Sequence, residues 1–236
     1  TVLSVFAKLW EDNWGPRLEH LLRNVLYTLL ANPGTTLGSI QRLLGDRDHR
    51  KGLVSHIQDR AVRSFWYDEY AGYSPAFQAV VTAPLLNKLG ALLTDHRMRR
   101  ILDTTESTLD LDVALANSEA IIVNLEKGAM GEGPANLLGG LITARLTLAG
   151  LARASVPEDR RAPFFAYLDE FPGFATALLA TGLSELRKYR VGLILAHQYL
   201  AQLDTYLRDA ILGNAGTMVC FRLGAPDASL IAREFA

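Results

Sequence analysis

Two acidic residues stand directly after an apolar run in this sequence. Residues 164–168 (Phe-Phe-Ala-Tyr-Leu) predict a short buried strand, and Asp169 and Glu170 follow it. In parallel sheets, ligands bind at the carboxyl ends of the strands. One carboxylate there can hold a water-coordinated Mg²⁺, and the next can orient and deprotonate an attacking water. The pair therefore suits nucleotide hydrolysis; the alternative is an ordinary strand that ends in solvated acids.

The next apolar run also ends in polar residues. Residues 191–196 predict a second strand, and His197 and Gln198 follow it. A polar side chain at this edge can sense the γ-phosphate of a nucleotide, and Gln198 fits best because its amide both donates and accepts hydrogen bonds. His197 has a simpler interpretation as a packed or solvent-facing imidazole. With no Cys or second His nearby at ligand spacing, a metal role for it is not expected.

A basic segment, residues 186–190 (Leu-Arg-Lys-Tyr-Arg), lies between these two runs. Cations at the carboxyl end of a helix interact favourably with its macrodipole, and this explanation needs no function. The alternative is an arginine finger that reaches the nucleotide of a neighbouring subunit. The residues alone leave both interpretations open.

The acidic pattern is that of a Walker B motif, but its usual companion is missing. No G-x-x-x-x-G-K-[ST] segment, which would cradle phosphates, occurs in the sequence. None of the five lysines follows a glycine. The sequence also contains no G-x-S-x-G elbow, H-E-x-x-H motif or Rossmann glycine fingerprint.

The composition describes a globular chain. Of 236 residues, 49% are hydrophobic and 21% are charged, which is enough apolar material for a core. The net charge of −1 excludes a globally basic nucleic-acid binder. A single cysteine, Cys220, excludes a disulfide scaffold and a four-thiolate zinc site. Because Cys220 lies in an apolar run, we expect a buried, inert thiol.

The elements that must position these residues occupy the second part of the chain. Short apolar runs at 121–125, 164–168, 191–196 and 217–223 predict strands. Helices are predicted near 135–153, 174–189 and 200–212, with another that starts at Pro226. This alternation indicates βαβ units and a parallel sheet.

Residues 1–102 are predicted to be all-helical. Apolar residues recur at helical spacing over 16–30, 36–44, 59–71 and 75–92, with Thr36 as a cap and Pro84 at a kink or boundary. This part holds 13 Lys+Arg against 9 Asp+Glu, whereas residues 103–236 hold 11 against 16. The near-neutral total therefore hides a basic and an acidic part.

No apolar stretch of about 18 residues occurs, so we expect no membrane segment, and no signal peptide is evident. The chain starts at Thr1 inside an apolar pattern and stops inside a predicted helix. We therefore expect a piece of a larger protein.

The combination of these motifs resembles the type IV secretion coupling ATPases of conjugative DNA transfer, in the HerA/FtsK group of DNA-pumping ATPases. The segments that carry the resemblance span most of the chain: residues 14–19, 85–88, 107–111, 122–128, 167–171, 183–189, 195–198, 214–217 and 221–224. Two departures are Pro172-Gly173, where the family often has Gln and another polar residue, and Glu126, where a small polar residue is common.

The resemblance implies an α/β fold, with a partial, mostly parallel RecA-like P-loop NTPase sheet in residues 103–236 and an inserted all-α domain in residues 1–102. The cofactors would be ATP and Mg²⁺. Asp169 would be the magnesium-side acid, Glu170 the catalytic acid and Gln198 the sensor. Arg187 would act in trans, with Lys188 or Arg190 as competitors. The phosphate loop would lie upstream.

The same resemblance implies a homo-hexameric ring that moves DNA, or a protein–DNA substrate, and meets secretion-system or relaxase-type partners. The parent protein would be cytoplasmic or at the cytoplasmic face of the inner membrane. The alternative is a non-hydrolysing P-loop-fold module that recruits DNA or a secretion partner through its helical domain. Residues 49–51 and the arginines at 97, 99 and 100 would then be the contact candidates.

Overall fold

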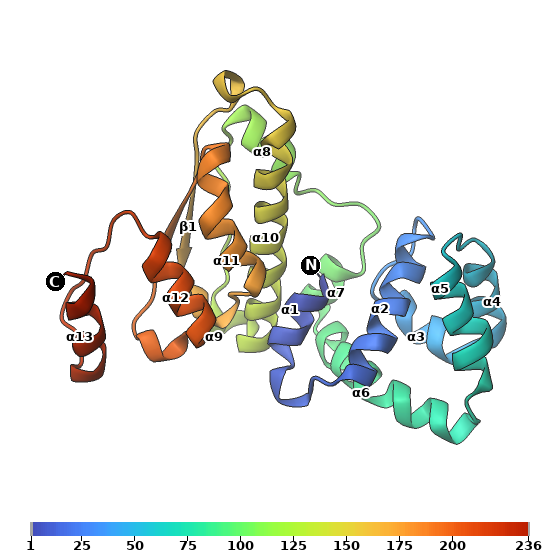
Figure 1. Ribbon diagram of the computed structural model, residues 1–236. Helices are drawn as coiled ribbons and strands as arrows, with labels where there is room; N and C mark the ends of the chain where they lie inside the picture. The colour runs from blue at the N-terminus through green and yellow to red at the C-terminus, as the bar shows by residue number, and fades with distance from the viewer. Residues whose placement is uncertain (1, 236) are drawn as a thin grey trace. The chain divides into compact units, whose positions relative to one another are not determined.

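The computed structural model describes residues 2–235, which form two compact units. Residues 10–108 make an all-helical unit, and residues 2–9 with 109–235 make a second unit that contains the sheet (Figure 1). The sequence predicted a division after residue 102. The structural units divide after residue 108, and the first helix belongs to the second unit.

The helical unit follows the predicted periodicity closely. Its helices are α2 (Pro16–Leu30), α3 (Ser39–Gly45), α4 (Arg47–Ser55), α5 (Arg60–Ser64), α6 (Pro75–Thr94) and α7 (His96–Leu102). Shorter elements are the 3₁₀ turns η1 (Glu11–Asn13) and η3 (Tyr70–Gly72) and the π-helical turn η2 (Phe65–Glu69). Helix α6 continues through Pro84 instead of ending there. Helices α4 and α7 were not predicted.

Side-chain caps explain where several of these helices begin. Asp46, Asp59 and Asp95 each accept backbone N–H groups at the start of α4, α5 and α7, and Ser74 does the same for α6. Each such cap contributes about 0.5–2 kcal/mol. The predicted cap Thr36 is not one, because α3 starts later and the Thr36 hydroxyl donates to Asp103.

The second unit is also mainly helical. Its longer elements are α1 (Val2–Leu9), α8 (Leu111–Asn117), α9 (Lys127–Met130), α10 (Glu132–Ala152), β1 (Phe164–Asp169), α11 (Ala177–Glu185), β2 (Val191–Ala196), α12 (Thr205–Asn214) and α13 (Ala225–Ile231). Short 3₁₀ turns are η4 (Arg153–Ser155), η5 (Glu158–Arg160), η6 (Phe171–Gly173), η7 (Leu186–Tyr189), η8 (Leu200–Gln202) and η9 (Ala232–Glu234).

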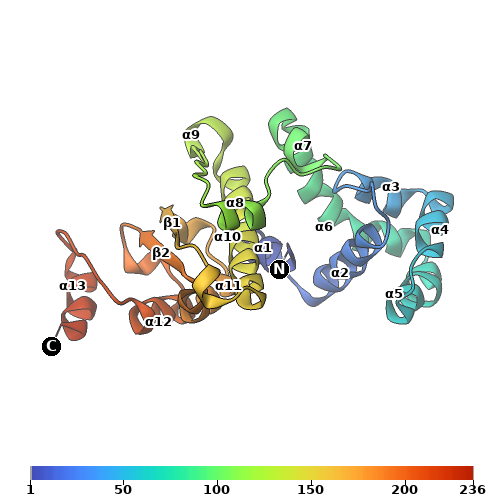
Figure 2. The same cartoon turned by 90° about the horizontal axis from the view of Figure 1, so that it is seen from above.

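Strands β1 and β2 pair in parallel and lie side by side (Figure 2). One face of this sheet packs on helices: Ala166 and Val191 join a core with Leu146 of α10 and Leu186 of η7. The other face leaves Phe165 and Tyr167 exposed. A parallel pair with helical crossovers is compatible with the α/β class.

Helix α10 approaches its neighbours closely through glycines. A Cβ on Gly140 would lie 2.8 Å from Val5 of α1, and one on Gly139 would lie 2.7 Å from the Phe174 ring. A Cβ on Gly150 would lie 2.4 Å from Leu186. These positions let α10 serve as the central helix of the second unit.

Two of the four predicted strands are absent from the described residues. Residues 121–125 and 217–223 have no regular strand structure, and Ile122 and Phe221 are 96% and 89% exposed. Both runs have strand-like composition, but a strand is stable only when its backbone pairs with a neighbour. Within residues 2–235, β1 and β2 pair only with each other.

The prediction for Cys220 was wrong for the same reason. We expected a buried thiol inside a strand, whereas Cys220 is a free, exposed cysteine. Its neighbours Val219 and Phe221 are exposed as well. Only Met218 and Leu223 of the segment are partly buried against the core, and Cys220 is not among the residues that pack there.

Two helices, α6 and the span from α10 through η4, are long and apolar enough to cross a membrane by length and composition alone. In the apolar 18-residue window of each helix, 28% is buried for α6 and 61% for the α10 span. The core helix of a soluble protein passes the same test, so this is weak evidence. The predicted absence of a membrane segment stays a prediction.

Candidate functional site

The pairing of β1 with β2 determines where the predicted site residues lie. The register aligns Phe164 with Val191 and Asp169 with Ala196. The residues that follow each strand therefore emerge at the same edge of the sheet. This juxtaposition joins residues that are almost thirty positions apart in the sequence.

Three of the four predicted site residues meet at this edge. Gln198 Nε2 donates a hydrogen bond of 2.6 Å to Glu170 Oε1. Asp169 Oδ1 accepts the Glu170 backbone N–H at 3.0 Å, and Asp169 is exposed. The contact brings the Gln198 amide to the Glu170 carboxylate, and Asp169 is the residue before Glu170. The chemical roles of these residues stay predictions.

The backbone of Glu170 has an unusual conformation that sequence reasoning missed. Its φ of 49° and ψ of 36° lie in the left-handed region. A non-glycine residue there costs about 1–2 kcal/mol, and such residues cluster at functional sites. The buried Phe171 and Pro172 of η6 follow at once and hold the turn. Pro172 and Gly173 therefore belong to a 3₁₀ turn that starts at Phe171, in place of the polar pair that we noted as missing.

His197 has a packing role. Its ring meets the ring of the buried Phe171 edge-on, with centroids 5.5 Å apart, and its Nδ1 lies 3.0 Å from the Tyr199 carbonyl oxygen. These contacts fit the packed imidazole rather than a sensor. Gln198 is thus the residue after β2 that contacts Glu170.

The donor set at this edge fits magnesium only in part. Within residues 2–235, no group of three or more His, Cys, Asp or Glu side chains gathers to hold a metal. Mg²⁺ needs no such group, because it is commonly held by one or two carboxylates, substrate phosphates and waters. Asp169 supplies one such carboxylate. In the described part of the chain, no lysine and no glycine-rich loop is placed beside these acids to bind the phosphates of a nucleotide.

Arg187, the fourth predicted site residue, does not join the acids. It lies in η7, just before β2 begins, whereas Asp169 and Glu170 follow the end of β1. Six residues at about 3.3 Å each separate the two ends of the sheet by roughly 20 Å. Within one chain, Arg187 and the acids therefore cannot share a ligand as small as a phosphate group.

The two competitors of Arg187 are engaged elsewhere. Lys188 Nζ contacts both carboxylate oxygens of Glu185 at 2.8 and 2.9 Å, and this hydrogen bonding raises the pKa of Lys188. Arg190 Nη1 donates to the Arg161 carbonyl. The Arg187 side chain is exposed, and we see no hydrogen bond or ion pair from it to the described residues. It is the freest of the three cations.

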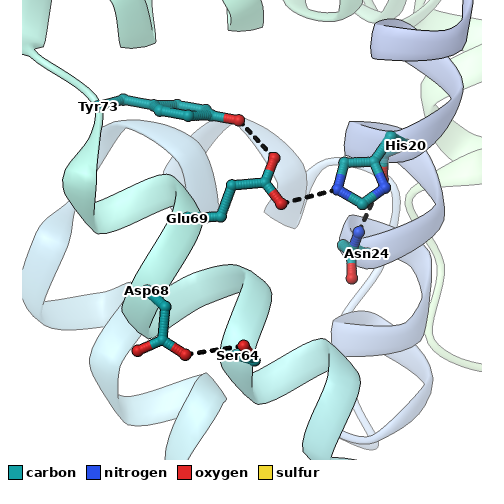
Figure 3. A network of polar contacts seen from close by, with 6 residues as sticks. All are labelled: His20, Asn24, Ser64, Asp68, Glu69 and Tyr73. Carbon is teal, nitrogen blue, oxygen red and sulfur yellow. Dashed lines mark hydrogen bonds and ion pairs between the residues drawn. The ribbon is translucent and has the colours of Figure 1, made fainter.

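A polar network in the helical unit was not anticipated from the sequence. His20 Nε2, on α2, lies 3.0 Å from Glu69 Oε2, and the Tyr73 hydroxyl donates a hydrogen bond of 2.5 Å to Glu69 Oε1 (Figure 3). His20 lies 49 positions before Glu69 in the sequence. Burial raises the pKa of Glu69, but the hydrogen bonds from Tyr73 and His20 outweigh it and the net shift is downward. The network joins α2 to the η2–η3 turns.

The two basic clusters of the helical unit, at residues 49–51 and 97–100, differ in how free their side chains are to contact a partner. Arg50 Nη1 donates to the carbonyls of Leu43 and Leu44, and its guanidinium lies 5.0 Å from the centre of the Tyr70 ring. It is therefore a structural residue. Arg99 and Arg100 of α7 are exposed, so they are better contact candidates than the 49–51 cluster.

Comparisons of this chain with protein-family models, with curated proteins and with solved structures found no match.

Proposed function

We propose that this chain forms part of an ATP-driven translocase that moves DNA, or a protein–DNA substrate, for conjugation or type IV secretion. The observation that supports it best is the contact between Glu170 and Gln198 beside Asp169, at the carboxyl edge of a parallel strand pair. The segments that resemble the coupling ATPases support it further. In this proposal the sheet is the later part of a RecA-like domain, and residues 10–108 are the inserted helical domain.

Each residue of the site has a distinct task in this mechanism. Asp169 would hold Mg²⁺ through water, and the bound ion would neutralise charge on the phosphates of ATP. Glu170 would orient the attacking water and accept its proton. Gln198 fixes Glu170 through Oε1, so the second carboxylate oxygen stays directed to the water. The amide thus couples the state of the nucleotide to the catalytic acid.

A phosphate-binding loop is absent from the 236 residues, so this site is incomplete without one from additional sequence. We therefore expect the chain as printed to hydrolyse no ATP. Steady-state hydrolysis by the purified 236-residue chain would contradict this part of the proposal.

Arg187 would act on the nucleotide of the neighbouring subunit in a homo-hexameric ring. Its separation from the acids of its own chain requires this, because a finger must touch the transferred phosphate. Mixing Arg187→Ala subunits with Glu170→Gln subunits is the test. If the mixed rings recover part of the lost activity, Arg187 acts in trans; if activity does not depend on mixing, the role is wrong.

The decisive experiment replaces Glu170 in the natural protein that carries this sequence together with a phosphate loop. Glu170→Gln is expected to bind ATP but lower the turnover rate by about 100-fold or more, as for loss of a general base. Glu185→Gln is the matched control, because it removes a carboxylate of α11 that pairs with Lys188. Unchanged turnover in Glu170→Gln would refute the assignment.

The missing phosphate loop favours a second candidate function, a non-hydrolysing module that recruits DNA or a secretion partner through the helical unit. Here Arg99 and Arg100 of α7 would make the contacts. If residues 10–108 bind duplex DNA, the affinity should fall steeply with salt, because released counterions drive such binding. Salt-independent binding of a secretion partner would point to protein contacts instead.

A further inference from the structure

Three arginines gather near the amino ends of β1 and β2, at the opposite end of the sheet from the acids. They are Arg153 in η4, Arg161 directly after η5 and Arg190 directly before β2. Arg153 is only 8% exposed. Its Nη2 donates to the Ala162 carbonyl at 2.5 Å, and its buried Nη1 has no partner among the described residues.

Backbone carbonyls hold the other two guanidinium groups in place. Arg161 donates from Nε to Val156 O at 2.8 Å and from Nη1 to Lys188 O at 2.9 Å. Arg190 donates from Nη1 to Arg161 O at 3.3 Å. A guanidinium has five N–H donors. Donors therefore remain on Arg161 Nη2 and on Arg190 Nε and Nη2.

The guanidinium groups of this cluster are not paired with carboxylates of the described residues. Within residues 2–235, we see no ion pair between these arginines and an acidic side chain. Burial lowers the pKa of Arg153, and the positive charges of Arg161 and Arg190 lower it further. The carboxyl ends of α10 and α11 lie close by, and each helix end contributes a charge of about −0.5. These helix ends offset about one of the three positive charges, and Glu158 and Asp159 of η5 form no ion pair with the cluster.

We propose that Arg153, Arg161 and Arg190 form a binding site for a phosphate-type dianion, either inorganic phosphate or a phosphomonoester. Guanidinium groups bind phosphate oxygens in pairs of charge-assisted hydrogen bonds. Arg161 and Arg190 contact the oxygens, and Arg153 supplies buried positive charge behind them. A dianion with several oxygens also matches three guanidinium groups better than a single carboxylate does. The site does not depend on the proposed hydrolysis function, since it lies at the other end of the strands.

The backbone of Arg190 offers a sharp test. Arg190 has a φ of 56°, which glycine adopts without the Cβ penalty. Arg190→Gly therefore removes a guanidinium while it relieves backbone strain, so the variant is expected to fold at least as well as the native chain. Arg160→Gln is the matched control, because Arg160 belongs to the neighbouring turn η5 and is exposed.

The measurement is calorimetric titration of the 236-residue chain with inorganic phosphate, with thermal unfolding as a second readout. Sodium chloride at equal ionic strength is the reference. We expect saturable binding by the native chain and by Arg160→Gln. In Arg190→Gly and Arg161→Gln, the affinity should be at least about tenfold weaker, as for loss of a charge-assisted hydrogen bond. The phosphate-induced rise of the melting temperature should shrink in parallel.

Two further outcomes decide the proposal. Equal phosphate affinity in the native chain and in Arg190→Gly would overturn it, and so would no saturable binding by the native chain. Titration with ribose 5-phosphate distinguishes the two sources of the ligand. Tighter binding of the sugar phosphate than of inorganic phosphate identifies a phosphomonoester, and the reverse order identifies the free ion.

Discussion

Tyr73 titrates in an unusual range because of one neighbour. Its hydrogen bond to Glu69 raises the pKa of Tyr73 to about 12, and burial and the charge of Glu69 act in the same direction. The pKa in the folded state thus exceeds the ordinary value of 10.0. The stability that this hydrogen bond contributes is complete below pH 10 and is lost as the pH rises from 10 to about 12.

The test is a titration of phenolate absorbance, in which the difference between the native chain and Tyr73→Phe isolates this tyrosine. In Glu69→Gln, the pKa of Tyr73 should fall back toward 10, because the charged acceptor is gone. His20→Gln is the control, since it removes the other contact of Glu69 and leaves the tyrosine bond in place. An unchanged titration in Glu69→Gln would show that burial, not the hydrogen bond, sets the value.

Single residues also show how much of the site the sequence can predict. Asp169, Glu170 and Gln198 were predictable, because polar residues that end parallel strands share an edge. The left-handed backbone of Glu170 was not, because Glu has no preference for that region and only the buried turn after it imposes the conformation. The arginine cluster was not predictable either. It depends on the contacts of Arg161 and Arg190 with distant carbonyls.

At the scale of elements, helix α10 provides a direct test of the packing of the second unit. Gly139→Ala would place a methyl group 2.7 Å from the buried Phe174 ring. Overpacking of this kind costs about 1–3 kcal/mol, whereas the gain in helix propensity is about 1 kcal/mol. We therefore expect a net loss of up to about 2 kcal/mol in the free energy of unfolding, measured by urea denaturation.

Gly90→Ala in α6 is the matched control. Gly90 also lies inside a helix, and a Cβ there meets nothing within 4 Å, so the gain in helix propensity of about 1 kcal/mol remains without overpacking. If Gly139→Ala stabilised the chain as much as Gly90→Ala, the close approach of α10 to Phe174 would be wrong.

The range of the contacts that stabilise an element explains which elements were predictable from the sequence. The prediction of a helix over 16–30 matches α2, because Pro16 sets its start and local periodicity defines its buried face. Helix propensity and capping act within a few residues. A strand depends on a partner distant in the sequence, so the predictions for 121–125 and 217–223 failed even though their composition is typical of strands.

At the scale of the whole molecule, the division into two units predicts how the chain can be dissected. Residues 10–108 have their own core, with Leu22, Val25, Ile40 and Leu43 almost fully buried. We expect the excised segment 10–108 to fold alone, with a cooperative urea transition and a near-ultraviolet dichroism signal from its buried aromatic residues.

Two matched segments make this dissection decisive. A segment that ends at residue 102 lacks Asp103 and so loses the contact with the Thr36 hydroxyl, which should lower its stability by about 1 kcal/mol relative to segment 10–108. In the other unit, α1 packs on α10, where Val5 lies against Gly140. Residues 109–236 alone should therefore be less stable than the same residues joined to 2–9 by a flexible linker. Equal stability of the two forms would mean that α1 is not part of that core.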